Sequence, residues 1–329
     1  MDEDGRGNSR WSNLGKAPEE SLPQTQGSSA AGRILFARLG DFPPTGIMSV
    51  RPDGTDFRQT LDWGDTPKAS PDGSRIAFSD GSDDRMDLSS LDPKTMLHSM
   101  KPEFFFSDAG MQRMGKGTKP SVYLVNADGS DVRKLASAPD VGFTRPAWSP
   151  DGSRIVFLGT RKRSTSVWIA NADGSGPRQL TPDGHYSYIT WMDSARLVGV
   201  RYASLNSSES WMAAIDCQTG RAEKLDVFQP GDLDPSWSSD GSKVAFSRGT
   251  DLCVMNSDGG ELRQLGDGMV PAWSPGGAWI AFSSRKNNRE GAEVFIVRPD
   301  GADEKRLTDT TPPQEDKIVE DWDPCWGSQ

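Results

Sequence analysis

The sequence predicts an all-β fold, a six-bladed β-propeller in which each blade holds four antiparallel strands. Three observations lead to this prediction: a motif that recurs six times, a second motif that follows most of its copies, and two chain ends that complete each other. A repeat of about 40–45 residues that contains four short strands has the period of a propeller blade.

The first motif is clearest at 146–157, which reads Pro-Ala-Trp-Ser-Pro-Asp-Gly-Ser-Arg-Ile-Val-Phe. It predicts a strand, a tight turn at Pro-Asp-Gly, and a second strand rich in β-branched and aromatic residues. The other copies are at 67–78, 235–246 and 271–282, with a decayed copy at 189–200 and a truncated one at 323–328. Ala69 replaces the tryptophan, Gly276 replaces the aspartate, and the decayed copy lacks Pro-Asp-Gly. We expect these blades to form, although the motif defines their turns less well.

The second motif is an apolar run that ends in Asp-Gly, as in 122–129, followed shortly by Arg133. An Asp-Gly pair between two apolar runs is a strong hairpin signal. Further copies are at 47–54, 167–174, 252–259 and 294–301, with a weaker one at 215–220. The Asn-Ala-Asp-Gly-Ser segments resemble part of a calcium loop, but the complete loop is absent, so we interpret them as hairpin turns.

The two ends of the sequence predict how the ring closes. The N-terminal part supplies an outer half-blade at 34–37, 47–54 and 58–61, and residues 322–328 supply an inner half. Pairing of N- and C-terminal strands in one sheet would bury edges that invite aggregation. We therefore predict one propeller domain over 33–329, with an insertion at about 80–120. Residues 1–32, rich in Gly, Ser, Pro and Glu, predict a disordered tail.

The repeated Pro-x-Trp-Ser-Pro-Asp-Gly motif resembles that of the TolB-like six-bladed propellers, which are built from WD40-like repeats of the Pro-Asp-Gly type. The resemblance covers roughly residues 33–328 and implies a non-catalytic scaffold that binds a protein or peptide partner, in the bacterial cell envelope. TolB also carries an α/β domain before its propeller. Nothing in this sequence corresponds to that domain, so the full role of TolB cannot be assigned to this protein.

The compartment rests on the same resemblance. The first residues are acidic and no apolar segment of a signal peptide follows them. Either the protein is cytoplasmic, or an export leader is missing from this sequence. The resemblance favours a periplasmic or extracellular location.

Composition limits the classes of partner. The formal net charge is −10, which argues against nonspecific binding of nucleic acid because that needs a basic surface. No apolar run of 18 residues is present, so we expect no membrane insertion. We expect a monomer. The three cysteines, Cys217, Cys253 and Cys325, predict no disulfide or redox role; Cys325 takes the position of Ala147 and should pack as a small apolar residue.

The insertion is the first candidate site. It contains five methionines and an aromatic cluster, and such residues form adaptable binding surfaces. Alternatively, the insertion folds back and covers its own blade. The residues predicted to bind a partner are Met100, Phe104, Phe105, Phe106 and Met111.

The mouth of the central channel is the second candidate site. Asp65, Asp234 and Asp323 come shortly before Pro-x-Trp, where two other blades have Arg145 and Tyr188. Converging carboxylates suit Ca²⁺ or a cationic peptide group. Asp232, Glu320 and Asp321 lie close by in the sequence. The alternative is a solvated acidic rim. No other cofactor is expected.

Evidence for an enzyme is weak in the sequence. No Gly-x-Ser-x-Gly elbow is present, and the only histidines, His98 and His185, have no nucleophile placed beside them by a motif. Similar propellers occur in peptidases and polysaccharide lyases, but the chain has no room for a peptidase domain. A lyase would need a group such as His185, Arg145 and Arg201. The alternatives left open are a small-ligand or glycan binder, and a propeller enzyme that uses the channel.

Overall fold

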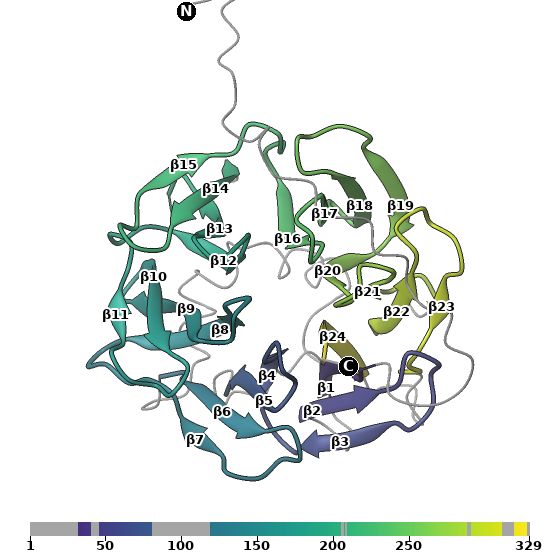
Figure 1. Ribbon diagram of the computed structural model, residues 1–329, viewed down its shortest axis with the longest axis horizontal. Coiled ribbons are helices and arrows are strands. Elements are labelled where there is room, and N and C mark those ends of the chain that lie inside the picture. The colour runs from purple at the N-terminus through teal and green to yellow at the C-terminus, as the bar shows by residue number, and fades with distance from the viewer. Residues whose placement is uncertain are drawn as a thin grey trace, which may run out of the picture.

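The computed structural model describes residues 32–40, 46–80, 119–204, 207, 209–287, 291–310 and 319–327. They form six four-stranded antiparallel sheets arranged in a ring around a common axis (Figure 1), which confirms the predicted six-bladed propeller. The predicted tail (1–32) lies almost wholly outside the described residues, as does most of the insertion. In the described part of the chain, no helix has the length and apolarity needed to cross a membrane.

Each blade runs from an inner strand at the axis to an outer strand at the rim. We number the blades in chain order, starting with the blade that contains both chain ends. Blade one is β24 (Val319–Trp326), β1 (Ile34–Gly40), β2 (Gly46–Val50) and β3 (Arg58–Leu61); blade two is β4 (Asp65–Ala69), β5 (Arg75–Ser79), β6 (Val122–Asn126) and β7 (Arg133–Lys134); blade three is β8 (Gly142–Trp148), β9 (Arg154–Arg161), β10 (Ser164–Asn171) and β11 (Arg178–Gln179). Blade four is β12 (Tyr186–Trp191), β13 (Arg196–Tyr202), β14 (Ser210–Asp216) and β15 (Ala222–Lys224); blade five is β16 (Asp232–Trp237), β17 (Lys243–Arg248), β18 (Asp251–Asn256) and β19 (Arg263–Asp267); blade six is β20 (Met269–Trp273), β21 (Ile280–Ser284), β22 (Glu293–Val297) and β23 (Lys305–Arg306).

The ring closes as predicted. The N-terminal strand β1 pairs antiparallel with the C-terminal strand β24, with Ile34 opposite Trp326 and Leu35 opposite Cys325. The guanidinium of Arg38 on β1 donates two hydrogen bonds of 2.6 Å to the carboxylate of Asp321 on β24. A chain end that would otherwise present an open sheet edge is thereby held in the ring.

The Ser-Pro-Asp-Gly turns between the first two strands of a blade are held by their own side chains. In blade three, the Ser149 hydroxyl donates to Asp151 at 2.5 Å and accepts the Arg154 backbone N–H at 2.9 Å. Blade four, which lacks the motif, makes a shorter turn in which Asp193 accepts the backbone N–H groups of Ala195 and Arg196. One aspartate therefore substitutes for the missing motif, and the blade forms.

The motif tryptophan connects neighbouring blades. The indole N–H of Trp148 donates to the Lys68 carbonyl of blade two at 3.0 Å, and that of Trp191 donates to the Ala147 carbonyl of blade three at 3.1 Å. Trp326 closes the ring in the same way, donating to the Ala272 carbonyl of blade six at 2.9 Å. In these three blades the tryptophan thus fixes the inner strand against the inner strand of the preceding blade, whereas the indole N–H of Trp273 in blade six has no partner among the described residues.

The hydrophobic cores lie between the blades. One cluster joins Leu124 of blade two to Phe143 and Phe157 of blade three, and another joins Met212 of blade four to Phe246 of blade five. The three cysteines are free and buried in these layers, as predicted for Cys325. Because every blade shares its core with its neighbours, we expect the ring to unfold as one unit.

In five blades, the glycine of the turn between the third and fourth strands lies close to the preceding blade, and this contact can be tested. Gly220, with φ of +72°, approaches the Leu180 carbonyl so closely that an added Cβ would lie 1.9 Å from its oxygen. Gly54 has a similar φ of +85° in the corresponding turn of blade one, with nothing within 4 Å of the same position. We expect Gly54→Ala to cost about 1 kcal/mol of unfolding free energy from backbone strain alone. Gly220→Ala should cost about 1–3 kcal/mol more because the neighbouring blade must move. Urea unfolding of both variants measures the difference, and equal losses would refute the contact.

Candidate functional site in the central channel

Each inner strand that contains the Pro-x-Trp motif is bulged at the residue before the proline. Thr66, Arg145, Asp234, Val270 and Asp323 have φ values between 46° and 53°, and the strand register shifts at each of them. Proline has no backbone N–H to donate to the next strand. A bulge at this point interrupts the ladder and redirects the preceding side chain. The X-Pro pair therefore encodes the placement of a side chain on the innermost strand.

These redirected side chains converge from different blades. The guanidinium of Arg145 in blade three lies 4.0 Å from the carboxylate of Asp323 in blade one. It also lies 6.0 Å from the centre of the Tyr188 ring in blade four. The charges of Asp234 and Asp65 act on the same arginine. We call Asp65, Asp234, Asp323, Arg145 and Tyr188 the channel cluster; its members come from five of the six blades.

The cluster remains open to solvent. The side chains of Arg145 and Asp323 keep 31% and 16% of their surface exposed, although both lie on inner strands that face the ring axis. Side chains from different blades thus meet near the ring axis and stay partly exposed.

The three predicted carboxylates are brought together, with one correction. Thr66, and not Asp65, occupies the position before the proline in blade two. Asp65 precedes it and is held by hydrogen bonds from the hydroxyls of Ser79 and Thr66. Asp234 accepts a bond from the Ser247 hydroxyl at 3.2 Å. In the part of the chain that is described, no three His, Cys, Asp or Glu side chains are grouped as metal ligands, so the calcium site stays a prediction.

Burial and mutual charge alter the acidity of the cluster. Burial raises the pKa of Asp65 to about 6, although the hydrogen bond from Ser79 lowers it. The negative charge of Asp323 raises it further. Burial also raises the pKa of Asp234 even though Arg145 opposes it. Burial alone would lower the pKa of Arg145, but Asp323 and Asp234 outweigh it and the pKa rises. Burial raises the pKa of the Tyr188 hydroxyl, so this group stays neutral.

The raised pKa of Asp65 predicts a pH dependence of stability. The folded protein holds this proton up to about pH 6, whereas an unfolded aspartate releases it near 3.8. Stability should therefore fall as the pH rises from about 4 to about 6, by at most about 3 kcal/mol, and then stay level. Asp65→Asn should remove this component of the slope in urea unfolding measured across that range. Parallel curves for the variant and the wild type would contradict the assignment.

Three other acidic residues near the inner strands have a structural role. Asp232 pairs with Arg248 at 2.7 Å, Glu320 pairs with Arg285, and Asp321 pairs with Arg38. All three carboxylates are buried. They therefore form internal ion pairs of the blades.

The residues nominated for a lyase do not assemble in the described structure. Arg201 lies over the rings of Tyr186 and Trp211, at 5.7 and 5.8 Å from their centres. Nδ1 of His185 is buried without a partner, and neither residue contacts Arg145. The residues nominated to bind a partner in the insertion, Met100, Phe104, Phe105, Phe106 and Met111, lie outside the described residues.

A groove of about 180 Å³ lies near the boundary of blades three and four, lined by Arg154, Ile169, Ala170, Asn171, Gly176 and Arg178. Arg154 stacks 4.8 Å from the centre of the Trp191 ring and donates to the Ser194 carbonyl at 2.8 Å. Arg75 makes the equivalent contacts between blades two and three, with Trp148 and the Ala172 carbonyl. Because this arrangement repeats around the ring, the groove belongs to the packing of blades.

Sequence reasoning missed a set of serines behind the carboxylates. Ser79, Ser247 and Ser283 occupy the same position on the second strand of their blades, directly after the motif phenylalanine. The first two donate to Asp65 and Asp234. A Phe-Ser pair in three of six repeats was the signal that could have identified them.

No family model matches the chain. It is 29% identical over 112 residues to the TolB homolog of Chlorobium luteolum, which is 32% of this chain and 26% of that protein. It is 28% identical over 166 residues to the uncharacterized peptidase YuxL of Bacillus subtilis, 47% of this chain and 24% of that protein. The matches thus span about a quarter of the length of these curated relatives.

Among solved structures, the chain resembles TolB from Acinetobacter baumannii with a TM-score of 0.66 and 16% identity, over 91% of this chain and 67% of that one. The putative TolB from Agrobacterium tumefaciens gives a TM-score of 0.56 and 13% identity, over 89% and 99% of the two chains. The chain therefore has the fold of the TolB-like six-bladed propellers, as the repeated motif predicted.

Proposed function

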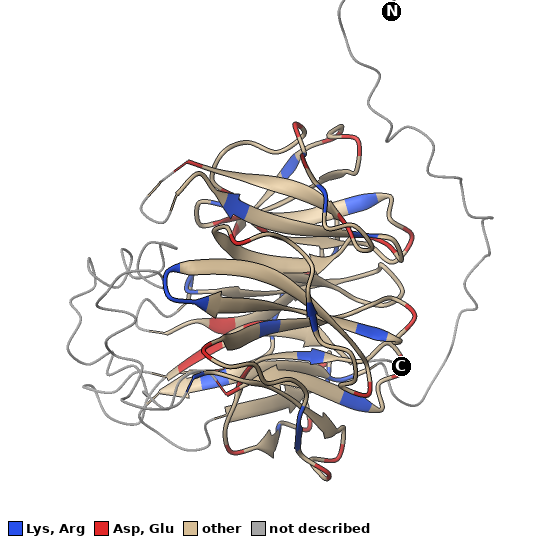
Figure 2. Ribbon diagram, turned by 90° about the vertical axis from the view of Figure 1, so that its left-hand side faces the viewer, with Lys and Arg blue, Asp and Glu red and all other residues tan. Residues whose placement is uncertain are grey.

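We propose that this propeller is a non-catalytic scaffold that binds a protein or peptide partner in the bacterial cell envelope, through one face of the ring. The observation that carries the proposal is a difference between the two faces. Antiparallel strands place the turns that follow each inner and third strand on one face, which we call the turn face. The connections after the second and fourth strands lie on the other, which we call the loop face (Figure 2).

The turn face is uniform. Its connections are four to seven residues long, and most are built from the two repeated motifs. The loop face is varied, since its connections range from the single residue Gly268 to the segment 80–121. Length variation on a rigid scaffold is typical of a binding surface, because loops can change without disturbing the framework.

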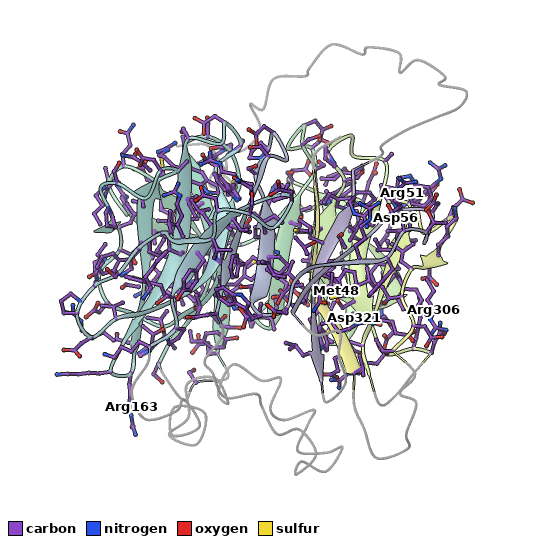
Figure 3. The ribbon with its side chains drawn as sticks, turned by 90° about the horizontal axis from the view of Figure 1, so that it is seen from below. Met48, Arg51, Asp56, Arg163, Arg306 and Asp321 are labelled. Atoms are coloured by element: carbon purple, nitrogen blue, oxygen red, sulfur yellow. The ribbon has the colours of Figure 1, made fainter. Side chains whose placement is uncertain are left out.

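The loop face also exposes side chains suited to recognition. Trp63 is 37% exposed and packs edge-on against Phe78 and Tyr123, with ring centres 4.9 and 5.1 Å apart. Leu39 is 40% exposed near the same blade junction. In blade three, the exposed hairpin at 161–163 carries three basic residues, and Arg163 extends away from the body of the ring (Figure 3). Aromatic and arginine side chains are enriched in protein interfaces.

The comparisons add support of a general kind. The fold is that of TolB, and one relative is named as a component of the Tol-Pal system, with 53% identity over a short stretch of 36 residues. This supports the envelope location and the protein partner. The match to an uncharacterized peptidase keeps a propeller enzyme as the alternative, and a glycan or small-ligand binder is the other.

Site-specific crosslinking tests the proposal. A photo-crosslinking residue at Lys162 probes the loop face, and one at Gln218 is the matched control on the turn face; both positions are exposed turns. We expect crosslinks to a discrete envelope protein from position 162 and not from 218, and binding of that protein in purified form. Deleting 86–116 tests whether the insertion contributes. Crosslinks only from position 218, or equally from both, would refute the loop face.

A further inference from the structure

Together with the nearby Lys68, the channel cluster carries an excess of one negative charge. Asp65, Asp234 and Asp323 supply three carboxylates, whereas Arg145 and Lys68 supply two cations; the charge of Lys68 also acts on Asp234. The charged groups are weakly partnered. Among the described residues, the one ion pair of Asp323 is with Arg145 at 4.0 Å, and the one hydrogen bond of Asp234 is that from Ser247 at 3.2 Å. Carboxylates in such surroundings are expected to have further donors.

A buried hydroxyl without a hydrogen-bond partner among the described residues lies in blade six, next to the blade of Asp323. Ser283 is fully buried and its Oγ has no hydrogen-bond partner. At the equivalent position, Ser79 and Ser247 donate to Asp65 and Asp234 on the inner strand of their own blade. The inner strand of blade six offers Met269 and Val270 instead, and these side chains cannot accept. Strand β21, which carries Ser283, also packs against β24, which carries Asp323.

We propose that the channel cluster binds one alkylammonium group, held by the carboxylates of Asp323 and Asp234 and the hydroxyl of Ser283. An ammonium has three N–H donors and no acceptor, which matches two carboxylates and a hydroxyl that lacks a partner. Its single charge neutralises the excess of the cluster and Lys68, whereas a divalent metal ion would leave a positive charge in a partly buried site. This site is independent of the proposed loop-face function, because a small amine probes it without a protein partner.

The test is calorimetric titration of the whole chain with n-butylammonium chloride at constant ionic strength. We expect saturable binding that Asp323→Asn weakens by about tenfold or more, because a charge-assisted bond is lost. Ser283→Ala should weaken it less. Arg145→Met should strengthen butylammonium binding, because it removes the cation that competes for Asp323. If Arg145 had only a structural role, its replacement would not increase the affinity. Asp226→Asn, in an exposed ion pair with Lys224, is the control of equal charge change and should leave binding unaltered.

Two peptide probes distinguish the natural sources of such a group. Nα-acetyl-lysine amide presents a side-chain ammonium, and glycyl-glycine amide presents a terminal one; the tighter binder identifies the source. If Asp323→Asn fails to fold, the opposite effects of Ser283→Ala and Arg145→Met decide the question. Absence of saturable binding to the wild type, equal binding by all variants, or binding of Ca²⁺ without butylammonium would overturn the proposal.

Discussion

Asp321→Ala should lower the free energy of unfolding by about 3–5 kcal/mol, the cost of leaving one member of a buried ion pair without its partner. Asp321 is fully buried and receives two bonds of 2.6 Å from Arg38, whose side chain is 11% exposed. Burial raises the pKa of Asp321 even against this arginine, so the carboxylate is costly to hold in charged form. Removal of the Asp321 carboxylate would leave the Arg38 guanidinium without its ion-pair partner, beside the Phe57 ring, whose centre is 4.7 Å away.

The Arg38–Asp321 pair lies where the ring closes, so its loss affects more than the two residues themselves. Arg38 and Asp321 join the first strand to the last (Figure 3 labels Asp321), so breaking the pair loosens the sheet that closes the ring. Urea unfolding followed by tryptophan fluorescence measures the effect. Asp226→Ala removes a carboxylate whose side chain is 87% exposed and should change stability by less than about 1 kcal/mol.

A double variant separates the ion pair from ring closure itself. Arg38→Met with Asp321→Leu replaces both charges by apolar groups, and such replacements are often neutral or stabilising. We expect it to recover most of the stability lost in Asp321→Ala. If Asp321→Ala is no more damaging than Asp226→Ala, the pair does not support closure.

Much of this architecture could be predicted from the sequence because the blade is encoded locally. Ser149, Asp151 and Gly152 build their turn within six residues, and a tryptophan such as Trp148 marks the inner strand in five of the six blades. The pairing of the two chain ends followed from counting half-repeats. The ion pair of Arg38 and Asp321, separated by 283 residues, leaves no local pattern, since its partners meet only when the ring closes.

The site was harder to predict for the same reason. Asp65 lies two residues before Pro67, whereas Asp234 and Asp323 lie directly before their prolines. The convergence on Arg145 depends on bulges at Asp234 and Asp323, and a bulge is a property of paired strands. The hydroxyl of Ser283 became informative only when its two equivalents proved to have partners.

Phe246→Ala should cost about 3–5 kcal/mol, the usual range for truncating a fully buried phenylalanine. Its side chain is 0% exposed and packs edge-on against Phe228, with ring centres 5.4 Å apart. The same cluster contains Val200 and Met212 of blade four together with Val244 of blade five. The cavity would therefore open between two blades, and the destabilisation would be shared by both.

The way in which Phe246→Ala unfolds tests whether the ring is one cooperative unit. Because each core is shared by neighbouring blades, we expect tryptophan fluorescence and far-UV circular dichroism to give coincident transitions at lower denaturant. Phe57→Ala, which truncates a ring that is 40% exposed, should cost about 1 kcal/mol or less and serves as the control. Two separated transitions in Phe246→Ala would show that blades four and five can melt alone. In that case the shared cores and the indole bonds between inner strands would not suffice to couple the ring.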